Sequence, residues 1–378
     1  MFFTPKLKIN LIGYFIQSFH FFGVLGFILG TLLGAFLCYF LNLSVSIILL
    51  MSLTGAAIFF LLAFGAKAIT GKEVIVYYHH EIAILIACSC VLKIFHWPVL
   101  QYLDITILGI ATFLAFGRIG CLSVGCCHGR PAKKGIVYSH EHVKAGFTPY
   151  YEGITLLPVQ LIESLFVFFV VIAGSLMILN DAIPGTVLIF YTVVYGSFRF
   201  VLEFFRGDAE RPYFRGLSEA QWTTLVLIAV SIIMSSAGIT PLYNWHIMMT
   251  ALLLLFSAFI ILRNNYGSKV TNPRHVKQIA IALNKAYKDE LSVQDENTSP
   301  VSVNIFQTKL GLNLSKGKVN QEGNLVNHYT ISCKKNNLLS YAVAEKLATI
   351  IQQIQKHKNQ FEIYERQNAV FHILFKEE

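Results

Sequence analysis

Residues 9–66 read INLIGYFIQSFHFFGVLGFILGTLLGAFLCYFLNLSVSIILLMSLTGAAIFFLLAFGA, and they contain no Asp, Glu, Lys or Arg. Residues 220–262 are equally free of these four residue types. The first stretch is nearly three times, and the second about twice, the ~20 apolar residues that cross a bilayer as a helix. Because backbone groups in lipid must pair within their own segment, such runs favour helices. The sequence therefore predicts an all-α polytopic membrane protein.

The overall composition agrees with this prediction. Of the 378 residues, 55% are hydrophobic and 13% are charged, which is about half the charged fraction of a soluble domain. Lys6 and Lys8 precede an apolar run that is too long for a cleaved signal peptide, so we interpret it as a retained first span. The break near residue 240 separates the last two apolar segments only weakly, so we expect seven to eight transmembrane helices. The apolar segments fall at 17–41, 45–66, 77–95, 103–124, 158–179, 184–205, 219–238 and 242–262.

The composition changes after Arg263. We expect residues 1–263 to form a transmembrane, transferase-like domain and residues 272–378 to form a small soluble α+β domain of unknown role. A domain of about 100 residues suits a stand-alone fold, joined here by a flexible connection near Asn264–Pro273. The apolar patterns predict helices at 276–291 and 338–354 and strands at 301–306, 329–333, 361–364 and 370–375.

Several charged residues lie inside the predicted spans, where each costs about 3 kcal/mol at the bilayer centre. Tyr195, Arg199 and Glu203 share one helical face, Arg206 follows within a turn, and Arg118 lies between two glycines. Converging arginines would bind a phosphate, because the guanidinium fork pairs with oxyanions in a bidentate way. In a membrane that phosphate is a phospholipid headgroup. The structural alternative is an internal salt bridge, with Arg206 reaching the interface and Arg118 capping its span.

His79 and His80 begin the third predicted span. An imidazole near the interface could act as a general base at neutral pH. The structural alternative is an interfacial anchor, a role that the neighbouring Tyr77 and Tyr78 also suit.

Cys121, Cys126 and Cys127 form a cluster of cysteines, followed by His128. Their spacing lacks the paired C-x₂-C motifs of a structural zinc site, so we expect no metal. Two adjacent cysteines and one further cysteine also do not make a disulfide framework. Two alternative functions remain open at this point. One is a membrane thiol-redox protein that uses these three cysteines, and the other is a non-catalytic phospholipid-binding or transport protein.

Three stretches together resemble the prolipoprotein diacylglyceryl transferase family. The segment 117–130 is similar in spacing to the family's G-R-x-G-N-F-x-N-x-E-x-x-G-R, and 157–163 is similar to H-P-S-Q-L-Y-E. The segment 195–206 resembles Y-G-x-F-R followed by E-F-F-R. Tyr78 and His79 match the start of the family's Y-H-G-G. The resemblance covers most of residues 1–240, and the tail lies outside it.

The resemblance implies transfer of a diacylglyceryl group from phosphatidylglycerol to the lipobox cysteine of a prolipoprotein. It implies a multi-pass protein of the bacterial cytoplasmic (inner) membrane. Arg118 and Arg199 would hold the phosphate, His79 would help to deprotonate the thiol, and Tyr195 and Glu203 would orient the arginines. These five would be the catalytic residues. The residues expected to bind substrate are Arg130, Gln160, Glu163 and Arg206.

The partners implied are phosphatidylglycerol, membrane lipid and the prolipoprotein signal peptide, with no nucleic acid and with no metal or organic cofactor. The sequence departs from the family pattern at Cys121, Val124 and Cys126, where the family has Asn, Asn and Glu. Thiols cannot reproduce the hydrogen bonds of an amide or a carboxylate, so the acceptor, the lipid or the activity is in question.

The side of the membrane is contested. The excess of Lys and Arg places the N-terminus, the 129–157 loop and the tail in the cytoplasm. The family's active face is instead extracytoplasmic. We follow the family for the face that holds the site and leave the side of the tail open.

Overall fold

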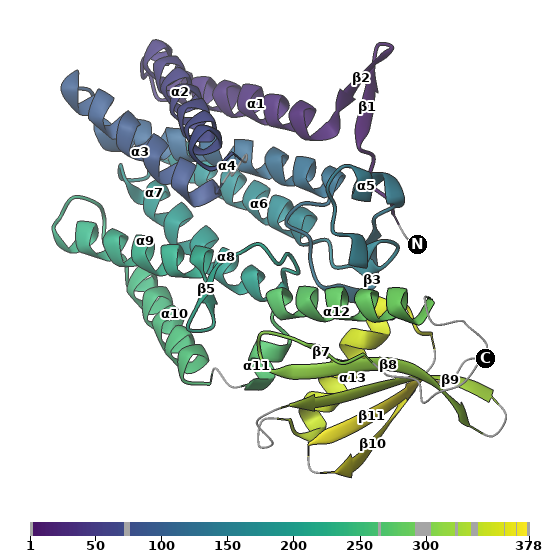
Figure 1. The fold of residues 1–378 in the computed structure, drawn as a ribbon. Helices are drawn as coiled ribbons and strands as arrows, with labels where there is room; N and C mark the ends of the chain where they lie inside the picture. Colours follow the sequence, from purple (N-terminus) through teal and green to yellow (C-terminus); the bar gives the residue numbers. More distant parts are fainter. Residues whose placement is uncertain are drawn as a thin grey trace.

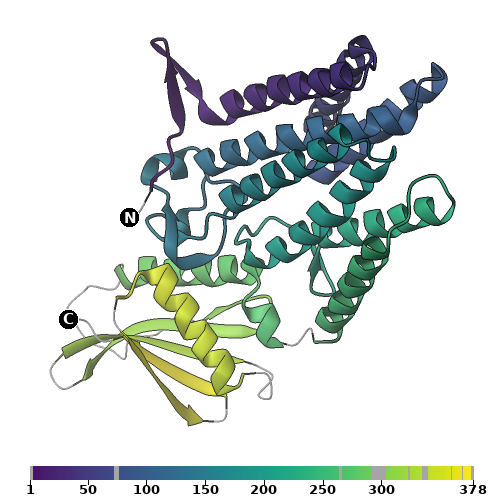
Figure 2. The ribbon, with the colours of Figure 1, turned by 180° about the vertical axis from the view of Figure 1, so that it is seen from behind.

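The structure is a computed structural model in which two parts of the chain lie against each other. It describes residues 3–71, 76–263, 266–291, 304–321, 324–333, 339–358, 360–367 and 369–375. Figure 1 shows a bundle of long helices with an α/β domain at one end, and Figure 2 shows the same arrangement from behind.

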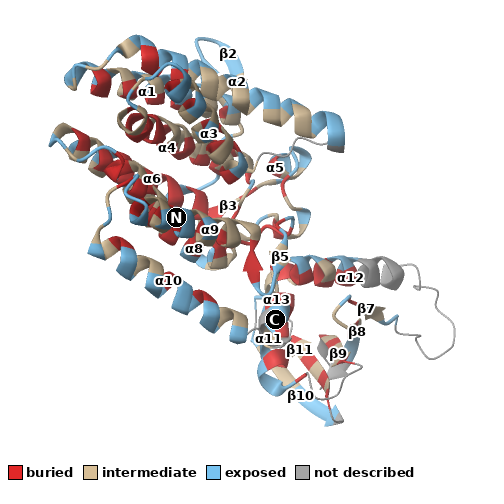
Figure 3. Cartoon of the chain, turned by 90° about the vertical axis from the view of Figure 1, so that its left-hand side faces the viewer, coloured by how far each residue is buried: buried red, intermediate tan, exposed pale blue. Residues whose placement is uncertain are grey.

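Seven helical segments among the described residues are long and apolar enough to cross a membrane. This confirms the prediction of a polytopic helical protein. Figure 3 shows that much of α10 is exposed, as expected for a helix whose outer face meets lipid. Six of the seven segments are single helices, namely α1 (Ser18–Phe40), α2 (Val45–Thr70), α4 (Val99–Val124), α6 (Val159–Leu179), α9 (Glu219–Ser236) and α10 (Asn244–Leu262).

The seventh segment, Thr186–Phe205, is irregular. It begins as α7 (Thr186–Phe190), widens into a π-helical turn (Tyr191–Tyr195) and continues as α8 (Gly196–Leu202). A 3₁₀ turn over Glu203–Phe205 then ends it. Turns of this π type occur mostly inside α-helices at functional sites.

Helix α3 (Tyr77–Ile94) is not among the seven apolar segments, but it also crosses the bundle. The hydroxyl of Tyr102 accepts a hydrogen bond from the backbone amide of Ser44 at 3.1 Å, so α4 begins beside the turn between α1 and α2. Helix α2 ends at the face of the bundle opposite to this turn. Helix α3 must therefore cross back through the bundle, because α4 starts beside the turn. Its 18 residues give a length of about 27 Å. The start of α1 and the end of α10 therefore lie at one face, which we call the polar face.

Close packing of α1 against α4 depends on glycine. A Cβ atom on Gly30 would lie 2.6 Å from the carbonyl oxygen of Gly109, so no side chain fits there. Small residues at helix interfaces let two backbones approach closely in a membrane.

The polar face carries short sheets as well as loops. The N-terminus forms a hairpin of β1 (Lys8–Leu11) and β2 (Tyr14–Gln17). The long loop after α4 holds β3 (Pro131–Val137) paired with β4 (Thr155–Leu156), together with α5 (His140–Lys144) and a 3₁₀ turn. Before α9, β5 (Tyr213–Phe214) pairs with β6 (Leu217–Ser218).

The C-terminal region is a five-stranded antiparallel sheet with two long helices, α12 and α13, packed against it (Figure 1). Its strand order is β10-β11-β9-β8-β7, which agrees with the predicted α+β class. The predicted strand at 301–306 includes only Phe306 of β7, and residues 301–303 lie outside the described residues. The elements are α11 (Tyr266–Val270), α12 (Pro273–Leu291), β7 (Phe306–Gln307), β8 (Leu312–Gln321), β9 (Asn324–Cys333), α13 (Tyr341–Gln355), β10 (Phe361–Gln367) and β11 (Val370–Phe375).

The C-terminal region packs against the loop that follows α4. One continuous hydrophobic cluster contains Tyr138 and Tyr151 of the loop and Ile279 and Leu283 of α12. An ion pair between Lys277 Nζ and Glu210 Oε1, 3.2 Å apart, joins the two parts at the surface.

Candidate functional site

Two buried arginines meet on one carboxylate inside the bundle. Arg118 Nε lies 2.9 Å from Glu163 Oε2, and Arg199 Nη1 lies 3.4 Å from the same atom. Arg118 comes from the end of α4, Glu163 from the first turns of α6, and Arg199 from α8. All three are at most 6% exposed. The structure therefore brings together two of the predicted catalytic residues and withdraws both from lipid.

A second carboxylate, Glu203, binds three arginines. Its Oε1 lies 2.7 Å from Arg199 Nη2 and 3.1 Å from Arg206 Nη1, and its Oε2 accepts a hydrogen bond from Arg211. Ser218 Oγ also donates to Oε2, at 2.9 Å. Glu203 thus links Arg199 in the bundle to the arginines of the polar face.

Asp208 completes the cluster. Arg206 donates to it in a bidentate way, with both contacts at 2.9 Å, and Arg211 Nε lies 3.2 Å from its Oδ2. The chain can turn here because Gly207 lies directly against Gly129, whose oxygen would be 2.5 Å from a Cβ atom on Gly207. Arg206 is therefore part of a buried ion-pair network rather than a residue that only reaches the interface.

The cluster carries an excess of positive charge. Four arginines (118, 199, 206 and 211) face three carboxylates (163, 203 and 208), which leaves one formal positive charge. Arg130 adds another, since its Nε donates to the backbone oxygen of Arg206 at 3.3 Å and it makes no ion pair among the described residues. Burial lowers the pKa of Arg130 from its usual value, but a guanidinium stays charged in proteins. An anion would complete the site.

Tyrosines line the inner side of the cluster. Tyr195 Oη donates to Glu163 Oε1 at 2.9 Å, so it positions this carboxylate rather than an arginine. The π-helical turn stacks Tyr195 on Tyr191, and the hydroxyls of Tyr191 and Tyr77 lie 2.7 Å apart. Tyr195 thus binds one oxygen of Glu163, while Arg118 and Arg199 lie against the other.

His79 lies at the polar face, apart from the arginine contacts described above. Its Nε2 is 3.0 Å from Glu219 Oε1, at the start of α9, and its side chain is 56% exposed. The next residue, His80, turns inward and its Nδ1 lies 2.9 Å from the carbonyl oxygen of Val76. The structure does not place His79 in contact with the residues expected to hold the phosphate.

Gln160 and Glu163, both expected to bind substrate, contact the protein instead. Gln160 Nε2 donates to the carbonyl oxygen of Cys126 at 2.8 Å, and Glu163 contacts Arg118, Arg199 and Tyr195. Both side chains are therefore held by protein partners, and their binding of substrate stays a prediction.

The three clustered cysteines lie beside the arginines. The sulfur atoms of Cys121, Cys126 and Cys127 are all within 4.8 Å of one another. The pKa of Cys127 is held well below its usual value by hydrogen bonds with the other two thiols and by the positive charges of Arg206 and Arg118.

Sequence reasoning missed Asp208, Arg211 and Ser218. Grouping residues by helical face applies only within a helix, and these three residues lie beyond the end of the helix. The available signal was the run Arg206-Gly207-Asp208-Ala209-Glu210-Arg211, in which charged residues of both signs follow the span directly.

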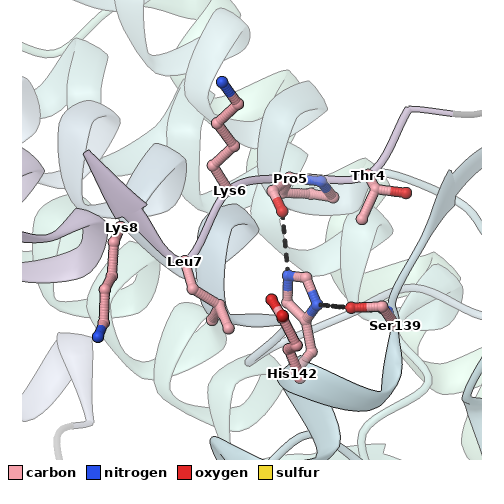
Figure 4. Close-up of a pocket in the computed structure, with 8 residues that line it drawn as sticks. Thr4, Pro5, Lys6, Leu7, Lys8, Ser139 and His142 are labelled. Carbon is pink, nitrogen blue, oxygen red and sulfur yellow. Dashed lines mark hydrogen bonds between the residues drawn. The ribbon is translucent and has the colours of Figure 1, made fainter. Parts of the chain in front are cut away.

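A separate pocket of about 630 Å³ lies at the N-terminal segment. Figure 4 shows His142 between Ser139 and the chain at Pro5, and its Nε2 lies 3.1 Å from the Pro5 oxygen. Burial lowers the pKa of His142. Lys6 and Lys8 also line this pocket, but none of the predicted site residues does.

Comparisons with known proteins find related sequences. The sequence model of the family described as prolipoprotein diacylglyceryl transferase matches residues 8–236, which include the whole arginine cluster. A phosphatidylglycerol–prolipoprotein diacylglyceryl transferase of Clostridium tetani is 33% identical over 139 residues, covering 36% of this chain and 53% of the relative. One from Clostridium perfringens is 30% identical, covering 36% of this chain and 52% of the relative.

A relative with the same name from Streptococcus agalactiae is 32% identical over 196 residues, covering 49% of this chain and 74% of the relative. The chain thus spans about half the length of the two clostridial relatives and about three quarters of the streptococcal one. Because the family match covers more than half of this sequence, the chain belongs to the prolipoprotein diacylglyceryl transferase family.

Proposed function

We propose that this protein transfers a diacylglyceryl group from phosphatidylglycerol to the cysteine thiol of a prolipoprotein signal peptide. The observation that carries the proposal is the meeting of Arg118 and Arg199 on a single oxygen of Glu163, inside a buried cluster with excess positive charge. The names of the relatives support the choice of lipid donor and protein acceptor.

The excess charge suits the donor lipid. The phosphodiester of phosphatidylglycerol carries one negative charge, and the cluster has at least one positive charge without a carboxylate partner. Guanidinium groups bind phosphate oxygens through paired N–H donors. Arg130 is the third candidate for this contact, because its side chain touches a backbone oxygen and no carboxylate among the described residues.

The same arginines would also stabilise the reaction as it proceeds. The acceptor sulfur attacks the glyceryl carbon that bears the phosphate oxygen, so a C–S bond forms while the C–O bond breaks. Glycerol phosphate then leaves, and its phosphate carries more negative charge than the diester did. A fixed positive cluster therefore binds the transition state more tightly than the ground state.

The acceptor thiol must lose its proton, since its free pKa of about 8.5 leaves little thiolate at neutral pH. We propose that His79 accepts this proton, because its imidazole is exposed at the polar face and Glu219 can stabilise the imidazolium. The peptide would then approach along the polar face, and the lipid would enter from within the bilayer.

We further propose that the protein lies in the bacterial inner membrane, with the polar face extracytoplasmic. Residues 272–378 would form a separate soluble domain at that same face, next to the loop that carries Arg130. The basic loops oppose this orientation by the positive-inside rule. A reporter enzyme fused to the C-terminus, active only on the extracytoplasmic side, tests the orientation, and its inactivity would place the polar face in the cytoplasm.

The activity is tested with the purified full chain, phosphatidylglycerol in detergent micelles and a lipobox peptide. Mass spectrometry should show a peptide heavier by one diacylglyceryl group, together with released glycerol phosphate. Arg199→Ala should abolish transfer. The matched control is Arg263→Ala, because Arg263 is exposed at the end of α10 and lies over Phe259, outside the cluster. Transfer that survives Arg199→Ala would contradict the proposal.

A further inference from the structure

The three clustered thiols are not explained by the proposed transfer reaction. Cys121 is in the last turn of α4, and Cys126 and Cys127 follow the end of that helix. Their sulfurs all lie within 4.8 Å of one another. Zinc bound by thiolates at about 2.3 Å in a tetrahedron separates them by roughly 3.8 Å. The observed spacing is thus within about 1 Å of the spacing that a shared metal ion requires.

A specific turn brings these thiols together. Gly125 adopts a left-handed conformation with φ of 81° and ends α4, and a Cβ atom there would lie 2.7 Å from the ring of Phe147. Cys127 is also left-handed, with φ of 54°, a conformation that costs a residue with a side chain about 1 kcal/mol or more. The chain therefore folds back over the end of α4, which the sequence spacing alone did not reveal.

Buried side chains hold this turn in place. Gln160, 1% exposed, donates to the carbonyl oxygen of Cys126 at 2.8 Å. Tyr138, fully buried, donates to the carbonyl oxygen of Leu122 at 3.0 Å. The thiols thus sit on a rigid support, which is what a preformed ligand site needs.

Positive charges lie beside the three thiols. Arg118 and Arg206 act electrostatically on Cys127 and attract negative charge at this position. Three thiolates around a divalent cation carry a net charge of −1, and around a monovalent cation −2, so the loaded site would complement both arginines. Sulfur ligands without oxygen ligands select soft cations over Mg²⁺ or Ca²⁺.

We propose that Cys121, Cys126 and Cys127 form a three-thiolate site for one thiophilic d¹⁰ cation of the Zn²⁺ or Cu⁺ class. This proposal goes beyond the transferase function and departs from our expectation of no metal, which was based on the sequence spacing. Among the described residues the thiol group has no fourth His, Cys, Asp or Glu ligand, so the fourth position is left to water or an exogenous donor.

The test uses the full chain in detergent, reduced and then freed of reductant without oxygen, and titrated with Cd²⁺. Thiolate–Cd²⁺ charge-transfer absorption in the ultraviolet should saturate at one ion per chain. Cys121→Ser, Cys126→Ser and Cys127→Ser should each weaken binding by at least about tenfold. Cys90→Ser is the matched control, because Cys90 is exposed on α3 and outside the cluster, and it should leave the titration unchanged. Thermal unfolding of each variant checks that it is folded.

Two results would overturn the site. Equal absorption from the wild type and from all three cluster variants would show that Cd²⁺ binds elsewhere. A disulfide between Cys121 and either neighbour, found by mass spectrometry of protein isolated without reductant, would support the thiol-redox alternative instead. Neither readout depends on lipid transfer, so a failure here is distinguishable from a failure of the proposed function.

Discussion

Arg118 and Arg199 share one oxygen atom of Glu163, although one comes from α4 and the other from α8. Glu163→Gln keeps the shape of the side chain but removes the charge that both arginines need. Breaking a buried ion pair in this way costs about 3–5 kcal/mol, since it leaves an uncompensated charge. We expect a lower unfolding temperature in detergent and a loss of lipid transfer. Glu345→Gln, on the exposed face of α13, is the matched control. An unchanged unfolding temperature would show that Glu163 does not hold the arginines.

The cysteines separate the transferase from the thiol-redox alternative. We expect Cys121→Ser and Cys126→Ser to keep most of the lipid transfer, because thiols are weak hydrogen-bond donors and acceptors. Arg199→Ala should remove it, because the developing phosphate charge would lack its partner in a low-dielectric site. Loss of transfer in both cysteine variants, together with full transfer in Arg199→Ala, would reverse the assignment.

Arg130 should act mainly in binding the donor lipid. Arg130→Gln removes a positive charge that no carboxylate among the described residues balances, so we expect KM for phosphatidylglycerol to rise by about tenfold. Arg130→Lys should reverse part of this rise in KM, since lysine keeps the positive charge but lacks the paired N–H donors of the guanidinium group. The control is Lys133→Gln, an exposed residue of β3. A change in kcat without a change in KM would place Arg130 in the chemical step instead.

His79 should affect kcat rather than lipid binding. Loss of a general base costs about 10²–10⁴-fold in rate. We expect His79→Asn to show this loss with an unchanged KM for the lipid, and Glu219→Gln to show a smaller one, because Glu219 acts only through His79. Rates measured with a peptide whose acceptor thiol is already ionised at high pH should recover in His79→Asn. If they do not, His79 has a different role.

The C-terminal domain should be removable without loss of the bundle. A chain that ends at Asn272 should still contain folded membrane helices, because the helix contacts of the bundle lie within residues 18–262. Its loop after α4 should become sensitive to protease, since Tyr138 and Tyr151 lose the cluster that they share with α12. Circular dichroism in detergent and limited proteolysis measure the two effects. A collapse of the bundle on truncation would show that the domain is integral.

The sequence was most informative where a single physical rule dominates. The absence of charge predicted the spans, and the helical spacing of Tyr195, Arg199 and Glu203 predicted one polar face on the segment Thr186–Phe205. The remaining features depend on contacts between distant segments or on backbone conformation. Asp208 and Arg211 join the cluster through a loop. The thiols meet because of the left-handed residues Gly125 and Cys127.

The C-terminal sheet was predicted only in part for a related reason. Strand β8, with the sequence LNLSKGKVNQ, mixes polar residues and a glycine, and it exists because it pairs with β9 along its whole length. Its partner β9 is richer in β-branched and aromatic residues and was predicted in its second half. Cross-strand pairing of this kind cannot be predicted from the sequence of either strand alone.

Because the chain crosses the bundle an even number of times, the two sides of the membrane meet very different parts of the protein. Within the described residues, the face opposite the arginine cluster consists of the turns at 41–44, 95–98, 180–185 and 237–243. None of these turns contains Lys or Arg. A protease, an antibody or a partner protein on that side meets four short turns and little else, whereas both termini, the long loop and the α/β domain share the other compartment. We therefore expect a macromolecule that regulates this protein to act on the side that holds the arginine cluster.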